Sequence, residues 1–191
     1  MHDIEPYYNW EHLYNASEDE RSPFYGKQYS EFEYTNAIYN FIIHPQWDSI
    51  GSSTLYIKVL MADYDKAYLI AELMGEWNDA IHNDIMYLKR DIMDVYSVNG
   101  IRHFILIGEN VLNYHSSDDS YYEEWADELA GDDGWVALIN FRPHVIADFK
   151  KEKLHRYLLI DKRWQNVNWR KTRPDLFFEM MQNTRMRMLG G

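Results

Sequence analysis

Apolar and polar residues alternate along two early stretches of the chain. In residues 38–43 the side chains of Tyr39, Phe41 and Ile43 share one face, and residues 55–61 continue the same alternation. A period of two is typical of a β-strand that buries one of its faces. Pro, Asp, Gly and Ser residues separate the two stretches and indicate a loop, so the sequence predicts an antiparallel hairpin.

Residues 66–98 change to a helical period. Their apolar positions are Ile70, Leu73, Trp77, Ile81, Ile85, Leu88, Ile92 and Val95. The average step is about 3.6 residues, which predicts one long helix with a buried side. Asn99–Gly100 provides a helix stop, because glycine tolerates the left-handed conformation. Asp63 or Asp65 could accept hydrogen bonds from the free N–H groups at the helix start, so we interpret this pair as N-caps.

Short apolar runs and helical patterns alternate over the rest of the chain. The predicted elements are a buried strand at 101–109, a helix at 120–130, a buried strand at 135–141, a helix starting near Pro143, a strand at 154–161 and a helix starting near Pro174. Continuous apolar runs are typical of strands covered on both faces. Proline favours the first turn of a helix, where its missing N–H costs nothing.

This order of elements predicts an α/β fold. We expect three layers around a mostly parallel sheet, with residues 38–43 as an antiparallel edge strand and the long helix after the second strand. An aromatic and acidic arm would occupy residues 1–36, and the α/β domain residues 37–161. Residues 162–191 would form a basic loop and a C-terminal helix packed on that domain.

Composition narrows the class of protein. Apolar residues make up 46% of the 191 and aromatic residues 16%, with 16 tyrosines, so a folded core is expected. The chain has no cysteine, which excludes disulfides, thiolate metal sites and a cysteine nucleophile, and it fits a cytoplasmic location. No window approaches 18 consecutive apolar residues, so we expect no membrane-spanning segment.

Polar side chains follow the ends of three predicted strands. These candidate binding residues are Asp63, Glu109, Asn110, His115, Arg142 and His144. In open α/β sheets ligands bind beyond the carboxyl ends of the strands, so parallel neighbours would bring these residues to one rim. Arginine can bind a carboxylate or phosphate, and histidine can transfer a proton near neutral pH. The alternative interpretation is that strand ends become polar only because they meet solvent.

Complete catalytic and cofactor motifs are missing from the sequence. Its glycines form neither a dinucleotide-binding motif nor a phosphate-binding loop, and there is no GxSxG motif. The eight histidines have no HxH or HExxH spacing. Asp63 and Asp65 resemble the Asp-x-Asp motif of haloacid dehalogenase hydrolases, but Lys66 and Ala67 replace the usual small hydroxyl residue. We therefore assign no catalytic residue, cofactor or metal.

The C-terminal part differs from the body in charge. Residues 1–147 hold 8 Lys/Arg and 26 Asp/Glu, whereas residues 148–191 hold 11 Lys/Arg and 5 Asp/Glu. Trp164, Trp169 and Arg170 lie in the basic stretch and are candidate interface residues, because Trp and Arg are frequent at binding hot spots. The acidic body disfavours nucleic acid, so we predict a protein partner or self-association as a homodimer.

The sequence therefore predicts a cytoplasmic, non-catalytic interaction or regulatory module. The alternative is a small-molecule enzyme that acts on a phosphorylated or carboxylated substrate at the carboxyl ends of the strands.

Overall fold

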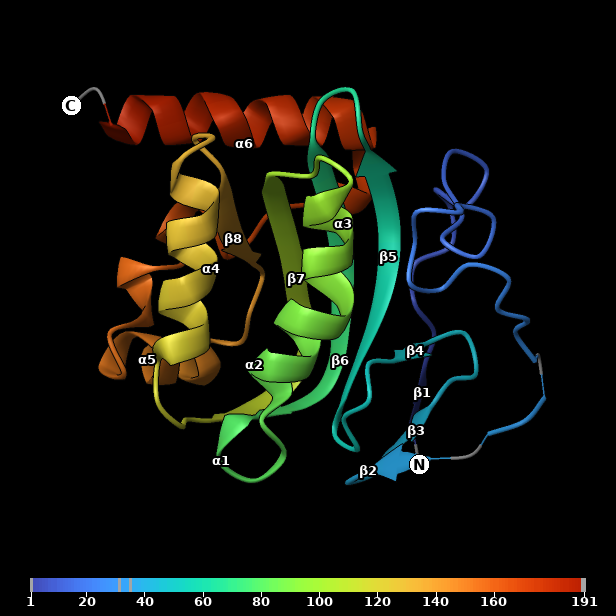
Figure 1. The fold of residues 1–191 in the computed structure, drawn as a ribbon. Coiled ribbons are helices and arrows are strands. Elements are labelled where there is room, and N and C mark those ends of the chain that lie inside the picture. Colours follow the sequence, from blue (N-terminus) through green and yellow to red (C-terminus); the bar gives the residue numbers. More distant parts are fainter. Residues whose placement is uncertain (1, 31, 35, 190–191) are drawn as a thin grey trace.

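The computed structural model describes residues 2–30, 32–34 and 36–189 and contains two mixed β-sheets (Figure 1). The larger sheet has the order β4 (Asp48–Ser49), β5 (Leu55–Asp63), β6 (Tyr68–Asn78), β7 (His103–His115) and β8 (Trp135–Ile139). The pairs β4–β5 and β5–β6 are antiparallel, whereas β6–β7 and β7–β8 are parallel. The smaller sheet has the order β1 (His2–Ile4), β3 (Phe41–Ile43) and β2 (Ala37–Ile38), with β1 parallel and β2 antiparallel to β3.

Helices cover one face of the larger sheet. They are α1 (Asp79–His82), α2 (Asp84–Met86), the π-helix η1 (Tyr87–Met93), α3 (Asp94–Val98), α4 (Ser120–Ala130), α5 (Pro143–Lys151) and the 3₁₀ turn η2 (Leu154–Arg156). The largest cluster of buried apolar residues lies beneath them and includes Trp77, Leu88, Trp125 and Phe149. We call this the helical face.

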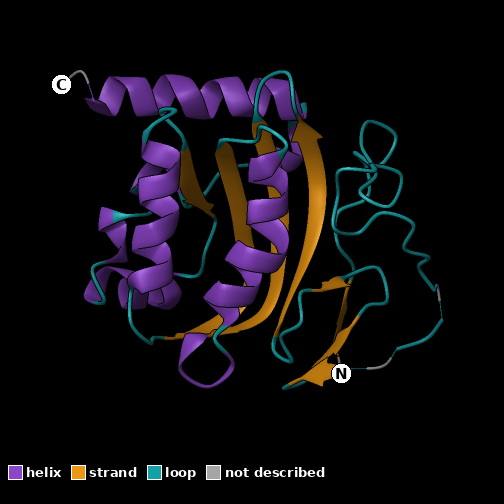
Figure 2. Ribbon diagram, in the orientation of Figure 1, coloured by secondary structure: helices purple, strands orange, loops and turns teal. Residues whose placement is uncertain are grey.

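The other face of the larger sheet, here called the second face, is covered by both ends of the chain. The C-terminal segment comprises η3 (Lys162–Trp164), η4 (Trp169–Lys171) and α6 (Pro174–Leu189). Its apolar side chains pack with those of β6, β7 and β8, as in the contact of Phe178 with Tyr68. The smaller sheet packs on Tyr56, Met74 and Leu112 of the same face. The arm, here the described part of residues 5–36, runs beside β5 as loops and turns (Figure 2).

The prediction of a mostly parallel three-layer sheet is wrong, because both sheets are mixed. Only four residues, 64–67, connect β5 to β6. A parallel connection needs a crossover of a dozen or more residues, so this short turn dictates an antiparallel hairpin. Residues 38–43 also do not form an edge strand of the larger sheet. They contribute to β2 and β3 of the smaller sheet instead, so the predicted hairpin between residues 38–43 and 55–61 is wrong as well.

The prediction of one long helix over residues 66–98 is also wrong. Its first third forms β6, and the rest is divided into α1, α2, η1 and α3, with Asn83 in the left-handed conformation between α1 and α2. The strand β6 is buried on both faces, so both sets of alternating side chains are apolar and imitate a helical spacing. Asp63 is consequently not a helix cap. Its Oδ1 accepts the N–H groups of Asp65 and Lys66 at 3.1 and 2.9 Å and stabilises the β5–β6 turn.

Other predicted elements are confirmed. The helices α4, α5 and α6 begin at Ser120, Pro143 and Pro174, and β8 forms within the predicted range. The prediction of a strand at 154–161 is wrong, because these residues form η2 and one isolated bridge between Leu159 and Ala137. Within the described residues, no helix combines the length and the apolarity needed to cross a membrane. The division at residues 36 and 161 stays a prediction.

Candidate functional site

Two glutamates and one arginine form a polar centre on the second face. Glu72 on β6 is 2% exposed, and Glu109 on β7 lies one strand away. Arg170, in η4, joins them: its Nη2 lies 3.1 Å from Glu72 Oε1 and its Nη1 lies 2.7 Å from Glu109 Oε2. The backbone N–H of Tyr7 donates to Glu72 Oε2 at 2.7 Å. A buried charge needs partners of this kind, and both glutamates have them.

Three aromatic rings cover this polar centre. Tyr7, Trp10 and Trp169 contact one another edge to face, with ring centres 4.9 to 5.4 Å apart. Trp169 Nε1 donates to Glu109 Oε1 at 2.9 Å, and the Tyr7 hydroxyl donates to the carbonyl of Arg170 at 2.9 Å. The arm and the C-terminal segment therefore meet directly above the two acids.

The two carboxyl groups differ in acidity. Burial raises the pKa of Glu72 to about 7, although the Tyr7 amide and Arg170 oppose this rise. Burial also raises the pKa of Glu109, but hydrogen bonds from Asn140, Trp169 and Arg170 outweigh it, so this pKa lies below its ordinary value. Glu72 can therefore exchange a proton near neutral pH, whereas Glu109 stays ionised.

The structure brings only part of the predicted rim together. Glu109 lies close to Arg142, whose Nε is 3.5 Å from the Glu109 carbonyl oxygen, and Asn110 is the next residue of β7. Asp63 lies at the opposite end of the strands from Glu109 and Arg142, because β5 runs antiparallel to β6. Asp63 faces Tyr68, at the start of β6. No single pocket can therefore combine Asp63 with Glu109 and Arg142.

Both histidines of the predicted rim already have partners. His115 Nε2 lies 3.0 Å from Glu76 Oε1, and His144 Nε2 lies 2.8 Å from the carbonyl oxygen of Leu112. His144 is in the first turn of α5, and His115 ends β7. These contacts hold the carboxyl end of β7 in place.

Two of the three candidate interface residues, Trp164 and Trp169, are buried within their own chain. Trp164 is 2% exposed and Trp169 is fully buried, both on the second face of the sheet. Arg170 is partly exposed, but its charge is used by Glu72 and Glu109. A second copy could not contact the two tryptophans unless the C-terminal segment left the sheet.

A cleft of about 540 Å³ separates the arm from β5, and we call it the arm cleft. Its lining residues are Glu5, Pro6, Tyr7, Tyr8, Trp10, Glu11, Tyr14, Asn15, Ala16, Phe32, Tyr34, His44, Gln46, Lys58, Val59 and Leu60. Tyr8 and Phe32 are 67% and 83% exposed, so large aromatic surfaces stand at its rim. Ligand pockets typically combine apolar and aromatic walls with a few polar groups, and this cleft has that composition.

Lys58 is the lysine of the arm cleft. It lies in β5 directly opposite Glu72 in the register, and its Nζ lies 3.9 Å from the ring centre of Tyr29. No carboxylate of the described residues lies within ion-pair distance of Lys58 Nζ. Burial lowers the pKa of Lys58, while the charges of Asp48 and Glu11 partly restore it. Lys58 thus offers a partly desolvated amine without a direct counter-ion.

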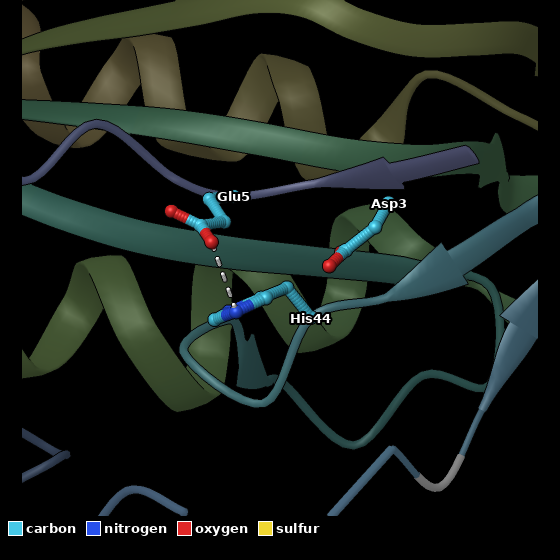
Figure 3. Close-up of side chains that lie close together, drawn as sticks. All are labelled: Asp3, Glu5 and His44. Carbon is cyan, nitrogen blue, oxygen red and sulfur yellow. Dashed lines mark ion pairs between the residues drawn. The ribbon is translucent and has the colours of Figure 1, made fainter. Parts of the chain in front are cut away.

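One group of side chains near the cleft has a metal-like composition (Figure 3). Asp3, Glu5 and His44 place one possible ligand atom each within 4.8 Å of one another, and His44 Nε2 lies 3.5 Å from Glu5 Oε1. The N–H of Gln46 donates to His44 Nδ1 at 3.2 Å, so the neutral ring carries its proton on Nε2. A metal would need the lone pair on Nε2. The geometry therefore favours a histidine–glutamate pair over a metal centre.

Comparison with known proteins adds no identity. No family model matches the chain, and no curated protein matches it. The arm cleft must therefore be interpreted from its own chemistry. Lys58, Tyr7 and Trp10 are not among the candidate site residues that the sequence predicts. The available signal was a lysine within the otherwise apolar run of residues 55–62, which placed Lys58 on the opposite side of the strand from Ile57.

Proposed function

We propose that this protein is a non-catalytic binding module whose ligand occupies the arm cleft. The observation that carries the proposal is Lys58, a half-buried amine with no carboxylate of the described residues in direct contact. A cation in such a position gains most from an anion that enters the cleft, because partial desolvation strengthens their attraction. The volume of about 540 Å³ lies within the usual range for small-ligand pockets.

The walls of the cleft favour a ligand with a flat apolar part. Tyr8, Phe32 and Tyr34 contribute aromatic surface on the arm side. Aromatic rings bind other planar groups by stacking or edge contacts, each worth about 0.5–1.5 kcal/mol beyond buried area. A compound or side chain that combines one anionic group with an aromatic or aliphatic part fits both features.

The polar centre supports binding better than catalysis. Glu109 is held by Arg170, Asn140 and Trp169, and Glu72 is enclosed beneath Tyr7. The enzyme alternative requires the predicted rim residues to share one pocket. Asp63 lies at the opposite end of the strands, and the two histidines contact other groups.

The proposal includes a protein partner and a location in the cytoplasm. The lack of cysteine in the 191 residues is compatible with a reducing compartment. Self-association through Trp164, Trp169 and Arg170 stays a prediction, although both indole rings are buried within their own chain. Sedimentation of the full chain at about 50 μM, where a weak dimer would populate, measures it directly.

Thermal-shift and calorimetric titration with simple probes test the proposed function. Benzoate and phenyl phosphate should raise the melting temperature, whereas the uncharged analogues benzamide and benzyl alcohol should not. Lys58→Met should abolish the stabilisation by the anions. The matched variant Lys151→Met changes an exposed lysine of α5 and should retain it.

A second pair of variants tests the aromatic wall. Phe32→Ser removes a ring at the rim of the cleft and should weaken probe binding, while Val98→Ser makes a similar change at an 87% exposed site on α3 and should not. The proposed function is wrong if no anion stabilises the protein, or if Lys58→Met is stabilised as much as the natural chain.

A further inference from the structure

The arm cleft carries charges of both signs. Its lining includes one lysine, Lys58, and two glutamates, Glu5 and Glu11. Among the described residues, no other Lys, Arg, Asp or Glu lines the cleft, so its wall has one positive and two negative side chains. A ligand with only a negative group would add to this excess of negative charge. A ligand with one positive and one negative group would leave it unchanged.

Glu11 and Lys58 are close to each other but do not form an ion pair. The negative charge of Glu11 opposes the lowering of the pKa of Lys58 by burial. The Glu11 carboxylate has no ion pair or hydrogen bond with any side chain that the structure describes. Glu5 differs, because His44 Nε2 lies 3.5 Å from its Oε1 (Figure 3). Glu11 is therefore the acid of the cleft that is free to bind a cation.

Two aromatic rings at the rim of the cleft are also free. Tyr8 is 67% exposed and Phe32 is 83% exposed. Neither ring contacts another ring among the described residues, whereas Tyr7 and Trp10 of the same arm pack on Trp169. A planar group that covers such a ring removes apolar area from water and gains a favourable ring contact. The rim therefore favours a ligand with an aromatic ring.

We propose that the arm cleft binds a free aromatic α-amino acid. Its carboxylate pairs with Lys58, its ammonium group pairs with Glu11, and its ring packs on Tyr8 and Phe32. This inference rests on the proposed function and names the ligand class of the same site. An α-amino acid carries both charged groups on one carbon, so it can bridge a lysine and a glutamate that do not touch. The volume of about 540 Å³ has room for the whole molecule.

Ligands that lack one charged group match the cleft less well. An aromatic carboxylate without an ammonium group leaves Glu11 unpaired and brings a second negative charge close to it. An aromatic amine leaves the half-buried Lys58 without a counter-ion and adds a like charge beside it. A hydrogen bond to a charged group changes affinity by about tenfold or more where water is partly excluded. The amino acid should therefore bind more tightly than either analogue by about tenfold.

Calorimetric titration of the full chain with matched compounds tests the inference. L-Phenylalanine has all three groups, hydrocinnamate lacks the ammonium group, phenethylamine lacks the carboxylate, and L-alanine lacks the ring. L-Phenylalanine should bind about tenfold more tightly, or better, than each of the other three. The increase in melting temperature at equal ligand concentration should follow the same order.

Two variants test the charged contacts separately. Glu11→Gln should reduce the affinity for L-phenylalanine by about tenfold and should not weaken the binding of hydrocinnamate, which has no ammonium group. Lys58→Met should weaken the binding of both compounds, because both present a carboxylate. Glu123→Gln makes the same change as Glu11→Gln at an exposed site on α4 and should leave every affinity unchanged.

The outcomes separate this inference from the proposed function. Equal affinities for L-phenylalanine and hydrocinnamate would overturn the inference, as would an equal affinity for L-alanine or a Glu11→Gln variant that keeps the preference for the amino acid. The proposed function would survive these results if hydrocinnamate still bound through Lys58. Failure of all four compounds to bind would contradict both. A preference for L-phenylalanine that Glu11→Gln removes and Glu123→Gln retains supports the inference.

Discussion

The two ends of the chain cover the same face of the larger sheet in different ways. The C-terminal segment buries its aromatic residues, with Trp164 2% exposed and Trp169 and Phe177 fully buried. The arm is richer in aromatic residues, yet it leaves Tyr8 and Phe32 mostly exposed and encloses a cleft. The same residue types thus form core in one region and the rim of a cleft in the other.

The difference follows from regular structure. Helix α6 presents Phe177, Phe178 and Met181 on one side, and this side lies flat on the sheet. The arm has no helix among its described residues, so its buried side chains Trp10, Ala16 and Phe24 reach the core separately and not from one continuous apolar side. Hydroxyl groups add polar contacts to the body: that of Tyr96 donates to Ser22, and that of Tyr29 donates to Asp48. Separate contacts of this kind leave space for a cleft between the arm and β5.

The largest expected effect is a loss of stability in the C-terminal segment, whose aromatic residues are buried. Trp169→Ala removes a fully buried indole and its hydrogen bond to Glu109, so it should lower the free energy of unfolding by about 3–5 kcal/mol. Phe32→Ala removes a ring that is 83% exposed and should change it by less than about 0.5 kcal/mol. Urea unfolding measures both. Equal losses would show that the arm is as well packed as the C-terminal segment.

A second test measures how stability depends on pH through Glu72, which lies where the arm meets the C-terminal segment. The pKa of Glu72 rises from 4.5 to about 7 on folding, so the folded chain holds this proton more tightly. The contribution of Glu72 to stability is therefore complete at low pH and is lost as pH rises from about 4.5 to about 7.

Glu72→Gln removes this titration. As pH rises from about 4.5 to about 8, the free energy of unfolding of the variant should increase by about 3 kcal/mol relative to that of the natural chain. Urea unfolding at several pH values measures the difference, and Glu179→Gln on the exposed side of α6 serves as the control. A difference that is constant with pH would show that Glu72 titrates normally.

A smaller effect is expected where the arm contacts the C-terminal segment directly. Tyr7→Phe removes the hydroxyl that donates to the Arg170 carbonyl and keeps the ring between Trp10 and Trp169. One such hydrogen bond contributes about 0.5–1.5 kcal/mol. Hydrogen exchange should speed up in residues 5–16 more than in α6. Uniform acceleration across the chain would mean that the two ends do not open separately.

The smallest expected effect concerns zinc. The ring of His44 accepts a hydrogen bond from Gln46 on Nδ1 and faces Glu5 with Nε2. Zinc at a modest excess over protein should therefore leave the melting temperature unchanged in the natural chain and in His44→Ala. An increase in melting temperature with zinc that His44→Ala abolishes would show that a metal ion binds at His44 and stabilises the arm.

The spacing of apolar residues predicted those elements that have one apolar and one polar side. Helices α4, α5 and α6 are amphipathic or start at a proline, and each forms where expected. β6 was missed because Tyr68–Asn78 is apolar on both sides, and such a run has no reliable period. The candidate site shows the same division. Glu109 and Arg170 are candidates from the sequence alone, but the contact of Arg170 with Glu72 joins residues 98 positions apart.

The sequence by itself determined the helices at the C-terminal half, the apolar strands and the separation of charge, because these depend on neighbouring residues. Only the tertiary structure decided the direction of β5, the burial of the two C-terminal tryptophans and the cleft beside Lys58. Strand direction depends on the length of one turn, and burial depends on which surfaces meet. The cleft exists because the arm reaches the core through a few separate side chains, whereas α6 packs on the sheet along one apolar side.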